Sequence, residues 1–167
     1  LVKAVVERIP APVGDKNGKL KALVFDSYFD SYRGVVALVR IVEGSVKVKD
    51  KIKLMATDAA YEVVELGVHT PEEKQKTTLE AGEVGYICGS IKSIRDIKVG
   101  DTITLASNPA EEALAGYKPM KPMVFCGIYP ADGARYAELK ESLEKLQLND
   151  ASLSFTPETS AALGFDF

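Results

Sequence analysis

Apolar and polar residues alternate in short runs from Leu20 to about Ala106. A period of two is typical of β-strands that bury one face. Turn residues separate the runs, and no long helical stretch lies between them. The pattern therefore predicts a mainly β fold, an antiparallel barrel or sandwich rather than a parallel sheet. The strands we expect are Leu20–Ser27, Val35–Val42, Ser45–Val48, Lys51–Met55, Glu62–Val68, Gly85–Ser90 and Asp101–Leu105.

The two ends of the chain follow other patterns. "LVKAVVERIPAP" reads as the last turns of a helix that prolines stop. Residues 108–122 are rich in proline and read as a linker, with a short helical turn indicated at Glu111–Leu114. "MVFCGIYP" then predicts a strand, "DGARYAELKESLEKLQLND" a helix and "SLSFTPETS" a second strand. Strand, helix and strand form the first half of a small α/β layer. The helix has an apolar stripe of Tyr136, Leu139, Leu143 and Leu146.

The tetrapeptide Phe-Asp-Ser-Tyr occurs twice in succession, in "FDSYFDSYRG". Asp26 and Asp30 could be the two carboxylates of a hydrolase, but no partner base or metal set accompanies them. Aspartates more often cap turns. We therefore expect the first copy to end a strand at Phe25 and Asp26, and the second to form the connection to the next strand. The two copies would then differ in backbone conformation.

Composition restricts the chemistry further. The chain has 167 residues, 46% of them hydrophobic, and a net charge of −3, as in a soluble globular protein that does not coat nucleic acid. No apolar run approaches the ~18 residues of a membrane span. His69 is the single histidine, and Cys88 and Cys126 lack the spacing of a zinc site. Neither a G-x-x-x-x-G-K-[ST] nor a G-x-G-x-x-G motif occurs, so we expect no catalytic, cofactor or metal residues in this segment.

Lysines alternate with apolar residues in "SVKVKDKIKLM". With a turn at Lys49-Asp50, the lysines would face solvent while the aliphatic residues fill the barrel. This is either an ordinary solvated strand face or a patch that contacts phosphates. A second basic connection follows in "IKSIRDIKVGD". The candidate contacts to ribosomal RNA are Lys47, Lys49, Lys51, Lys53, Lys92, Arg95 and Lys98.

Several motifs of the β-rich segment resemble the second-domain β-barrel of translational GTPases. They are "GVV" at Gly34, "RI" at Arg40, "GSV" at Gly44, "DKIKL" at Asp50, "LEAGEVGYI" and "VGDTIT". Lys49 stands where that barrel often has glycine, which disfavours a left-handed turn there. Four longer stretches resemble the elongation factor 4 family of ribosomal GTPases, so that the resemblance covers essentially the whole chain. They are "ERIPAPVGD", "LGVHTPE", "NPAEEALAGYKPMKPMVFCGIYP" and "LEKLQLNDASLSFTPETSAALGFDF".

This resemblance implies a division of the chain and a function for it. Residues 1–12 would be the tail of a GTPase domain with its linker, 13–107 the domain II barrel, 108–122 a linker and 123–167 an incomplete ferredoxin-like α/β domain III. The parent protein would bind GTP with Mg, hydrolyse GTP on the ribosome and move tRNAs backward as a fidelity factor.

The resemblance also implies partners and a location. The segment would dock on ribosomal RNA and proteins, on tRNA and on its own GTPase domain. The protein would be cytoplasmic and ribosome-associated, or peripheral on the inner face of the cell membrane. The chain starts without methionine and stops within an apolar pattern. We therefore expect an excised piece, whose end at Gly164–Phe167 is disordered or pairs with another copy. A stand-alone barrel that binds a protein or a small ligand is the alternative.

Overall fold

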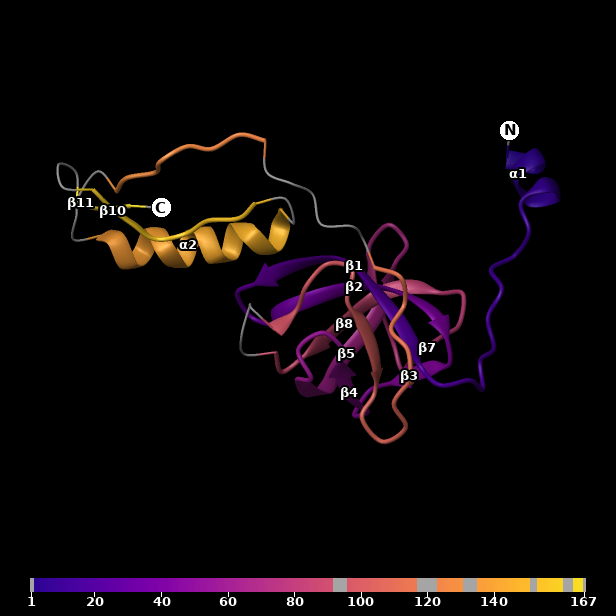
Figure 1. Cartoon of the computed structure of the whole chain (residues 1–167). Coiled ribbons are helices and arrows are strands. Elements are labelled where there is room, and N and C mark those ends of the chain that lie inside the picture. The colour runs from indigo at the N-terminus through magenta and orange to yellow at the C-terminus, as the bar shows by residue number, and fades with distance from the viewer. Residues whose placement is uncertain are drawn as a thin grey trace.

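The computed structural model describes residues 2–91, 96–116, 123–130, 135–150, 153–160 and 164–166. Nine strands, β1 to β9, follow a short first helix and precede a second helix and a small hairpin (Figure 1). The elements are α1 (Val2–Arg8), β1 (Lys21–Asp30), β2 (Gly34–Glu43), β3 (Ser45–Lys47), β4 (Lys51–Leu54), β5 (Ala60–His69), β6 (Glu73–Lys76), β7 (Thr78–Glu80), β8 (Val84–Gly89), β9 (Thr102–Leu105), α2 (Tyr136–Asn149), β10 (Glu158–Ser160) and β11 (Gly164–Asp166).

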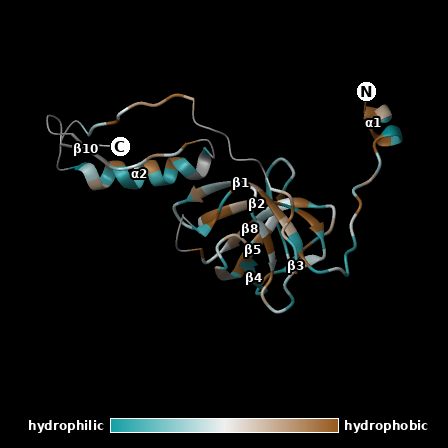
Figure 2. Ribbon diagram, viewed as in Figure 1, coloured by the Kyte–Doolittle hydropathy of each residue, from teal (hydrophilic) through white to brown (hydrophobic). Residues whose placement is uncertain are grey.

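The main sheet closes into an antiparallel barrel, as the alternation predicts. Its strands are ordered β4-β9-β1-β2-β8-β5-β6, and an additional pairing of β4 with β5 closes the ring. The closed ring leaves only β6 as an edge strand of this sheet. Figure 2 shows hydrophobic residues concentrated along the barrel strands. The barrel interior holds one apolar cluster whose largest members include Leu20, Ile41, Ile52, Leu66 and Ile103.

Two short strands were not expected from the sequence. β6 has the sequence EKQK, and β7 has the sequence TLE. β6 pairs with the end of β5, and β7 pairs with β3. Neither strand has an apolar alternation of its own, so partner strands rather than sequence periodicity determine them.

The doubled tetrapeptide spans the end of one strand and the turn that follows it. β1 contains the whole first copy and the first half of the second, through Asp30, and the turn occupies residues 31–33 before β2. The expected hairpin is present, but the prediction that the first copy ends the strand is wrong. The pairing with β2 extends to Asp30 opposite Gly34, and a register irregularity between Val24 and Asp26 shifts the alternation within the strand. Cross-strand hydrogen bonds thus outweigh the turn preference of the first Asp-Ser pair.

The predicted helices at both ends are present. α1 covers Val2–Arg8, with no buried residue. α2 covers the expected helix, and Lys145 Nζ lies 2.8 Å from Glu141 Oε1, one turn earlier on the helix. The helical turn expected at Glu111–Leu114 is absent from those residues.

Of the two strands expected around α2, the first is not formed and the second is formed only at its end. Residues 123–130 and 153–157 have no strand pairing, whereas Glu158–Ser160, the last three residues of "SLSFTPETS", form β10. Met123, Val124 and Phe125 are 84–90% exposed, so no sheet covers them. β10 and β11 pair with each other, so residues 164–166 have a strand partner within the chain. The division at residues 12, 107 and 122 and the ferredoxin-like assignment stay predictions.

α2 lies against one end of the barrel. It packs on β1, where Lys145 Nζ lies 5.3 Å from the centre of the Phe29 ring. Leu143 is 6% exposed, whereas Leu146 on the same helix is 50% exposed. The apolar stripe of α2 is therefore buried at Leu143 and partly open to solvent at Leu146.

Candidate functional site

A tight turn between β3 and β4 presents three lysines. Lys47 N–H donates to the Asp50 carboxylate at 2.8 Å, and Asp50 N–H donates back to the Lys47 carbonyl at 3.1 Å. Lys49 has a φ of 75°, so the turn is left-handed although the residue is not glycine. The expectation that Lys49 would disfavour such a turn is therefore wrong. The Asp50 carboxylate stabilises the turn by accepting a backbone N–H.

The lysines of this turn face solvent, as the alternation predicts. Lys47, Lys49 and Lys51 are exposed. Ile52, which follows Lys51 in β4, is buried. None of the three lysines forms an ion pair with any residue in the described part of the chain. Lys53 differs, because its Nζ pairs with Asp58 at 2.6 Å. We call Lys47, Lys49 and Lys51 the basic strip.

The second group of candidate basic residues does not join the basic strip. Lys98 is exposed, and its carbonyl accepts the Asp101 N–H. The Asp101 carboxylate accepts the Ala56 N–H, which places Lys98 near the Met55 end of β4. The basic strip lies at the Lys51 end of the same strand. Lys92 and Arg95 lie outside the described residues.

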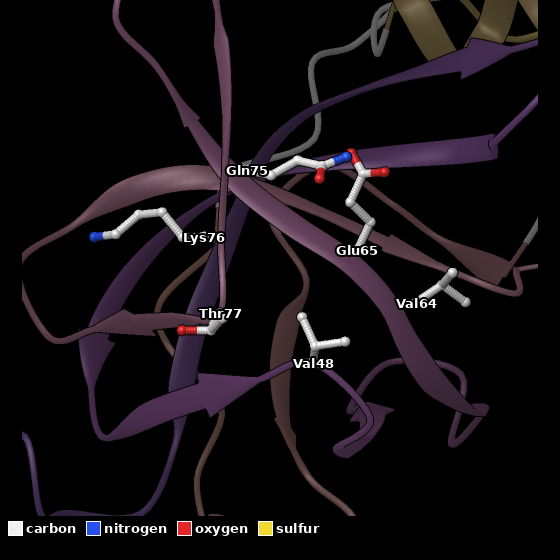
Figure 3. Close-up of a pocket in the computed structure, with 6 residues that line it drawn as sticks. All are labelled: Val48, Val64, Glu65, Gln75, Lys76 and Thr77. Carbon is white, nitrogen blue, oxygen red and sulfur yellow. The ribbon is translucent and has the colours of Figure 1, made fainter.

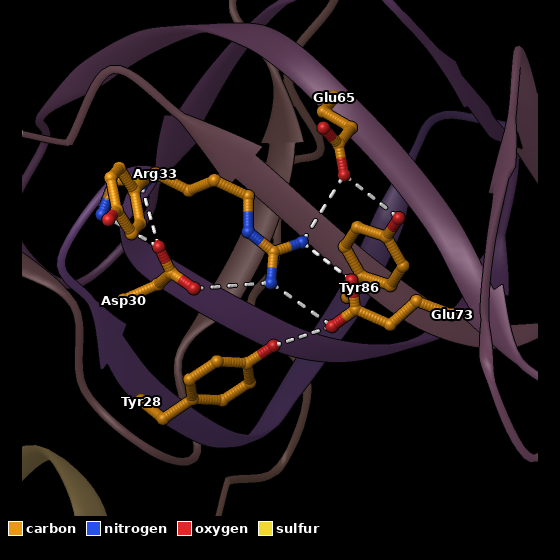
Figure 4. Close-up of polar contacts among 7 residues, drawn as sticks. Tyr28, Asp30, Arg33, Glu65, Glu73 and Tyr86 are labelled. Carbon is orange, nitrogen blue, oxygen red and sulfur yellow. Dashed lines mark hydrogen bonds and ion pairs between the residues drawn. The ribbon is translucent and has the colours of Figure 1, made fainter.

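A second polar group joins two hairpins on the outer face of the barrel. The Arg33 cluster consists of Tyr28, Asp30, Arg33, Glu65, Glu73 and Tyr86 (Figure 4). Arg33 Nη1 donates to Glu73 at 2.7 Å and to Glu65 at 3.3 Å. The guanidinium also lies over the Tyr86 ring, 5.7 Å from its centre. Arg33 therefore links the β1–β2 turn to β5 and β6.

Two tyrosines complete the hydrogen bonding of this cluster. The Tyr28 hydroxyl donates to Glu73 at 3.1 Å, and the Tyr86 hydroxyl donates to Glu65 at 2.9 Å. Tyr86 is fully buried, together with Val36 and Cys88, in a small apolar cluster outside the barrel interior. A Cβ on Gly67 would lie 2.7 Å from the Tyr86 hydroxyl oxygen and 2.4 Å from the Lys74 carbonyl oxygen. Glycine at 67 is thus required for this packing.

The electrostatics of the Arg33 cluster indicate a structural role. The hydrogen bond from Arg33 lowers the pKa of Glu73, and the bond to Glu73 raises the pKa of Arg33. Backbone N–H groups of Arg33 and Tyr32 lower the pKa of Asp30. Burial raises the pKa of Tyr86. These groups therefore keep their ordinary charge states at neutral pH, as in an ion-pair network rather than a proton-transfer site.

The other candidate residues occupy separate places. Asp30 accepts the N–H groups of Tyr32 and Arg33 at 2.8 and 2.9 Å, so it caps the turn as predicted. Asp26 lies within β1 and accepts the N–H of Ser27. His69 ends β5, where its ring centre lies 5.4 Å from that of Tyr86. Within the described residues, no group of acidic, histidine and cysteine side chains could hold a metal ion.

The two cysteines are both free, and they differ in exposure. Cys88 is buried and Cys126 is exposed. Burial raises the pKa of the Cys88 thiol to about 11, so the thiol stays protonated at neutral pH. No described helix is long and apolar enough to cross a membrane.

A pocket of about 670 Å³ opens between the β3–β4 turn and the outer face of β5 and β6. We call it the β5–β6 groove, and its lining residues are Val48, Val64, Glu65, Gln75, Lys76 and Thr77. Figure 3 shows Glu65 and Gln75 together at one end, Val48 and Thr77 at the other, and Lys76 directed away from the others. Val48 is the residue between two lysines of the basic strip.

Neither the Arg33 cluster nor the β5–β6 groove was predicted from the sequence. Arg33 lies more than 30 residues before Glu65, Glu73 and Tyr86 in the sequence. Their meeting depends on the register of β5 with β6 and with β8. The spacing of Asp30 and Arg33 beside a predicted turn was the single local indication of a pair.

Comparison with known proteins identifies the barrel and then relatives of the whole chain. Residues 34–104 match the family model of elongation factor Tu domain 2, which covers the barrel from β2 to β9. Over 168 residues, the chain is 64% identical to elongation factor 4 of Clostridium perfringens (strain SM101 / Type A), covering 100% of the chain and 28% of that protein. The whole chain thus matches one segment of proteins named elongation factor 4.

Further proteins named elongation factor 4 match the chain in the same way. The protein of that name from Clostridium tetani (strain Massachusetts / E88) is 62% identical over 167 residues, with 100% of the chain and 28% of the relative covered. The one from Clostridium botulinum (strain Langeland / NCTC 10281 / Type F) is 60% identical over 166 residues, with 99% and 28% covered. The chain thus spans 28% of the length of these relatives. The predicted family resemblance over the whole chain is confirmed.

Proposed function

We propose that this chain is the docking segment of a ribosome-binding translation factor that hydrolyses GTP. The observation that carries the proposal is its 64% identity, over its full length, to a protein named elongation factor 4. The rest of the relatives' length would supply the GTPase domain, with GTP and Mg as its ligands. The division into a GTPase-domain tail, a domain II barrel (13–107), a linker and a ferredoxin-like domain III (123–167) belongs to the same proposal.

The barrel supports this role through its rigidity. A closed sheet with a packed interior keeps its shape while neighbouring domains move. Ribosomal RNA presents phosphates, and lysines without partners are free to contact them. Within the described residues, Lys47, Lys49 and Lys51 have this property. We propose them as the principal RNA contacts, and Lys53, Lys92, Arg95 and Lys98 as secondary ones.

We further propose that the whole protein acts in the cytoplasm on ribosomes and tRNA, moving tRNAs backward as a fidelity factor. Peripheral attachment to the inner face of the membrane would be an additional location. Hydrolysis by Asp26 and Asp30 receives no support, because Asp30 caps a turn and Asp26 bonds to its neighbour's backbone.

Ribosome cosedimentation tests the proposal. The full-length protein should sediment with ribosomes in the presence of a non-hydrolysable GTP analogue. The triple variant Lys47→Ser, Lys49→Ser and Lys51→Ser should bind about 10-fold more weakly at low salt and show a smaller loss of affinity as salt rises.

A triple variant of paired lysines provides the control. Lys16, Lys19 and Lys21 each form an ion pair with a glutamate. Replacing these three with serine changes the net charge equally but removes lysines that are already neutralised. If both triple variants lost binding equally, the basic strip would be rejected as a specific RNA contact. Failure of the unaltered protein to sediment with ribosomes would reject the proposed function.

A further inference from the structure

The β5–β6 groove lies directly beside the basic strip, and no role has yet been assigned to it. We propose that the groove takes one unstacked base of an RNA whose phosphates contact Lys47 and Lys49. This inference rests on the proposed RNA-docking function, and it adds a preference for RNA that has a base outside its helix. Proteins commonly read RNA at such splayed bases rather than within the duplex.

Backbone hydrogen bonds fix the position of the β3–β4 turn, which carries the basic strip, next to the groove. Val48 N–H donates to the Thr77 carbonyl at 3.2 Å, and Lys49 N–H donates to the Val63 carbonyl at 2.8 Å. Val63 N–H in turn donates to the Asp50 carbonyl at 2.9 Å. The turn is thus attached to β5 on one side and to Thr77 on the other. A phosphate held by Lys47 or Lys49 would place the adjoining base near Val48.

The lining of the groove suits a base. Val64 lines the groove and is 59% exposed, although valine is usually buried, and Val48 adds a second apolar surface. Gln75 and Thr77 also line the groove, are exposed, and can both donate and accept hydrogen bonds. The volume of about 670 Å³ lies within the range of small-molecule sites, about 300–1,000 Å³. A flat group with an apolar face and a polar edge fits this combination.

The nearby carboxylates leave the charge at the turn positive. Glu65 accepts hydrogen bonds from Arg33 and Tyr86, and Asp50 accepts one from the backbone of Lys47. Glu62 lies opposite Lys51 in the β4–β5 register and makes no ion pair within the described chain. It therefore reduces the attraction at Lys51 more than at the other lysines. For this reason we assign the phosphate contacts to Lys47 and Lys49.

Lys76 does not compete for this role. Its Nζ pairs with Glu83, and Figure 3 shows its side chain directed away from the other lining residues. The groove thus combines apolar side chains, an amide, a hydroxyl and the Glu65 carboxylate, which is paired with Arg33, and the turn that carries the basic strip adjoins it. This charge arrangement favours RNA over an acidic or neutral peptide.

Fluorescence anisotropy with two labelled RNA hairpins tests the inference. One hairpin carries a single-nucleotide bulge, and the other is fully paired. The 167-residue chain should bind the bulged hairpin about fivefold more tightly, because a base held in the groove adds a contact that the duplex lacks. An abasic nucleotide in the bulge should remove this preference.

Two variants distinguish the contribution of the groove to RNA binding from that of the basic strip. Val64→Ser combined with Gln75→Ala should lower the affinity for the bulged hairpin to that for the paired one, and should leave the paired hairpin's affinity unchanged. Lys47→Ser combined with Lys49→Ser should weaken binding of both hairpins. Val84→Ser is the matched control, since Val84 is 54% exposed on β8 and does not line the groove.

The outcomes distinguish this inference from the proposed function. Equal binding of both hairpins, with loss of both in the lysine variant, would overturn the groove inference and retain RNA docking. A preference that survives Val64→Ser with Gln75→Ala would also overturn it. Unchanged binding of both hairpins by the lysine variant would instead reject RNA docking by the basic strip. Circular dichroism of each variant confirms that it is folded.

Discussion

Arg33 is the residue on which the outer polar cluster depends. Its guanidinium contacts Asp30, Glu65 and Glu73, and its side chain is only 26% exposed. Replacing it with methionine would leave three carboxylates together without their cation. Because the cluster is partly buried, we expect Arg33→Met to lower the free energy of unfolding by about 1–2 kcal/mol, between the values for exposed and buried ion pairs.

Urea unfolding with Arg40→Met as the control measures this effect. Arg40 is an exposed arginine on β2 with no ion pair among the described residues. Its replacement should change stability by no more than about 0.5 kcal/mol. Equal effects of the two substitutions would show that Arg33 stabilises the barrel no more than a surface arginine does.

Asp101 makes the free energy of unfolding fall as pH rises, whereas a carboxylate in an ion pair makes it rise. Its side chain accepts N–H groups of Ala56 and Thr102 through Oδ1, while Oδ2 is buried without a hydrogen-bond partner. Burial raises the pKa of Asp101 above its ordinary value, although the bonds to Oδ1 and the nearby Lys98 oppose the shift. The folded state therefore binds the proton more tightly, and this group loses stabilising effect as pH rises from about 4.

Asp101→Asn removes this titration while it keeps an oxygen for the two N–H groups. The stability of the variant relative to the original chain should therefore increase as pH rises from about 4 to about 7. Any change in stability from burying the asparagine amide is the same at every pH. It therefore shifts the difference in free energy of unfolding between the two chains by a constant amount. Urea midpoints at several pH values measure the difference. A difference that is constant with pH would contradict the prediction.

At the level of single residues, the sequence predicted which side chains are exposed better than it predicted which residues contact one another. The lysines of the basic strip face solvent because alternation in a strand determines which face a side chain occupies. The conformation of Lys49 was misjudged, because the Asp50 carboxylate and the bond from Lys49 N–H to Val63 hold the turn. Such tertiary hydrogen bonds are not visible in local sequence.

At the level of elements, the β3–β4 turn stores backbone strain at Lys49. A φ of 75° is unfavourable for a residue with a Cβ and costs glycine nothing. Lys49→Gly should therefore raise the free energy of unfolding by about 0.5–1 kcal/mol. Lys51→Gly also removes one lysine charge, but from a regular strand. This substitution should lower the free energy of unfolding by a similar amount.

Thermal and urea unfolding of these two glycine variants provide the measurement. The opposite signs distinguish backbone strain from the loss of a lysine, which both variants share. If both substitutions destabilise the chain, the strain at Lys49 is too small to matter. If both stabilise it, relief of repulsion within the basic strip is the dominant effect.

The strands show where sequence periodicity suffices and where it fails. The seven predicted barrel strands alternate because each lies between a packed interior and solvent. β6 and β7 lack that alternation and depend on pairing with β5 and β3. Conversely, residues 123–130 are apolar but have no partner strand, and their side chains remain exposed. An apolar run predicts a strand only where a neighbour can complete its hydrogen bonds.

At the level of the whole molecule, the barrel and α2 have separate stabilising contacts. The apolar cluster of the barrel interior includes no residue of α2. α2 instead rests on β1 through Lys145 and Phe29, and Leu143 is its buried apolar residue in the described part of the helix. Local unfolding of α2 should therefore leave the barrel intact, as expected for regions with few shared contacts.

Leu143→Ser tests this independence. Loss of a buried leucine side chain should weaken the packing of α2 by about 2 kcal/mol and speed amide hydrogen exchange along Tyr136–Asn149. Exchange at the barrel amides of Ile87 and Ile103 should stay slow and unchanged. Leu146→Ser, at a position 50% exposed on the same helix, should alter neither region appreciably. A joint acceleration of helix and barrel amides in Leu143→Ser would mean that the two unfold as one unit, and the barrel could not then serve as a rigid body beside a movable α2.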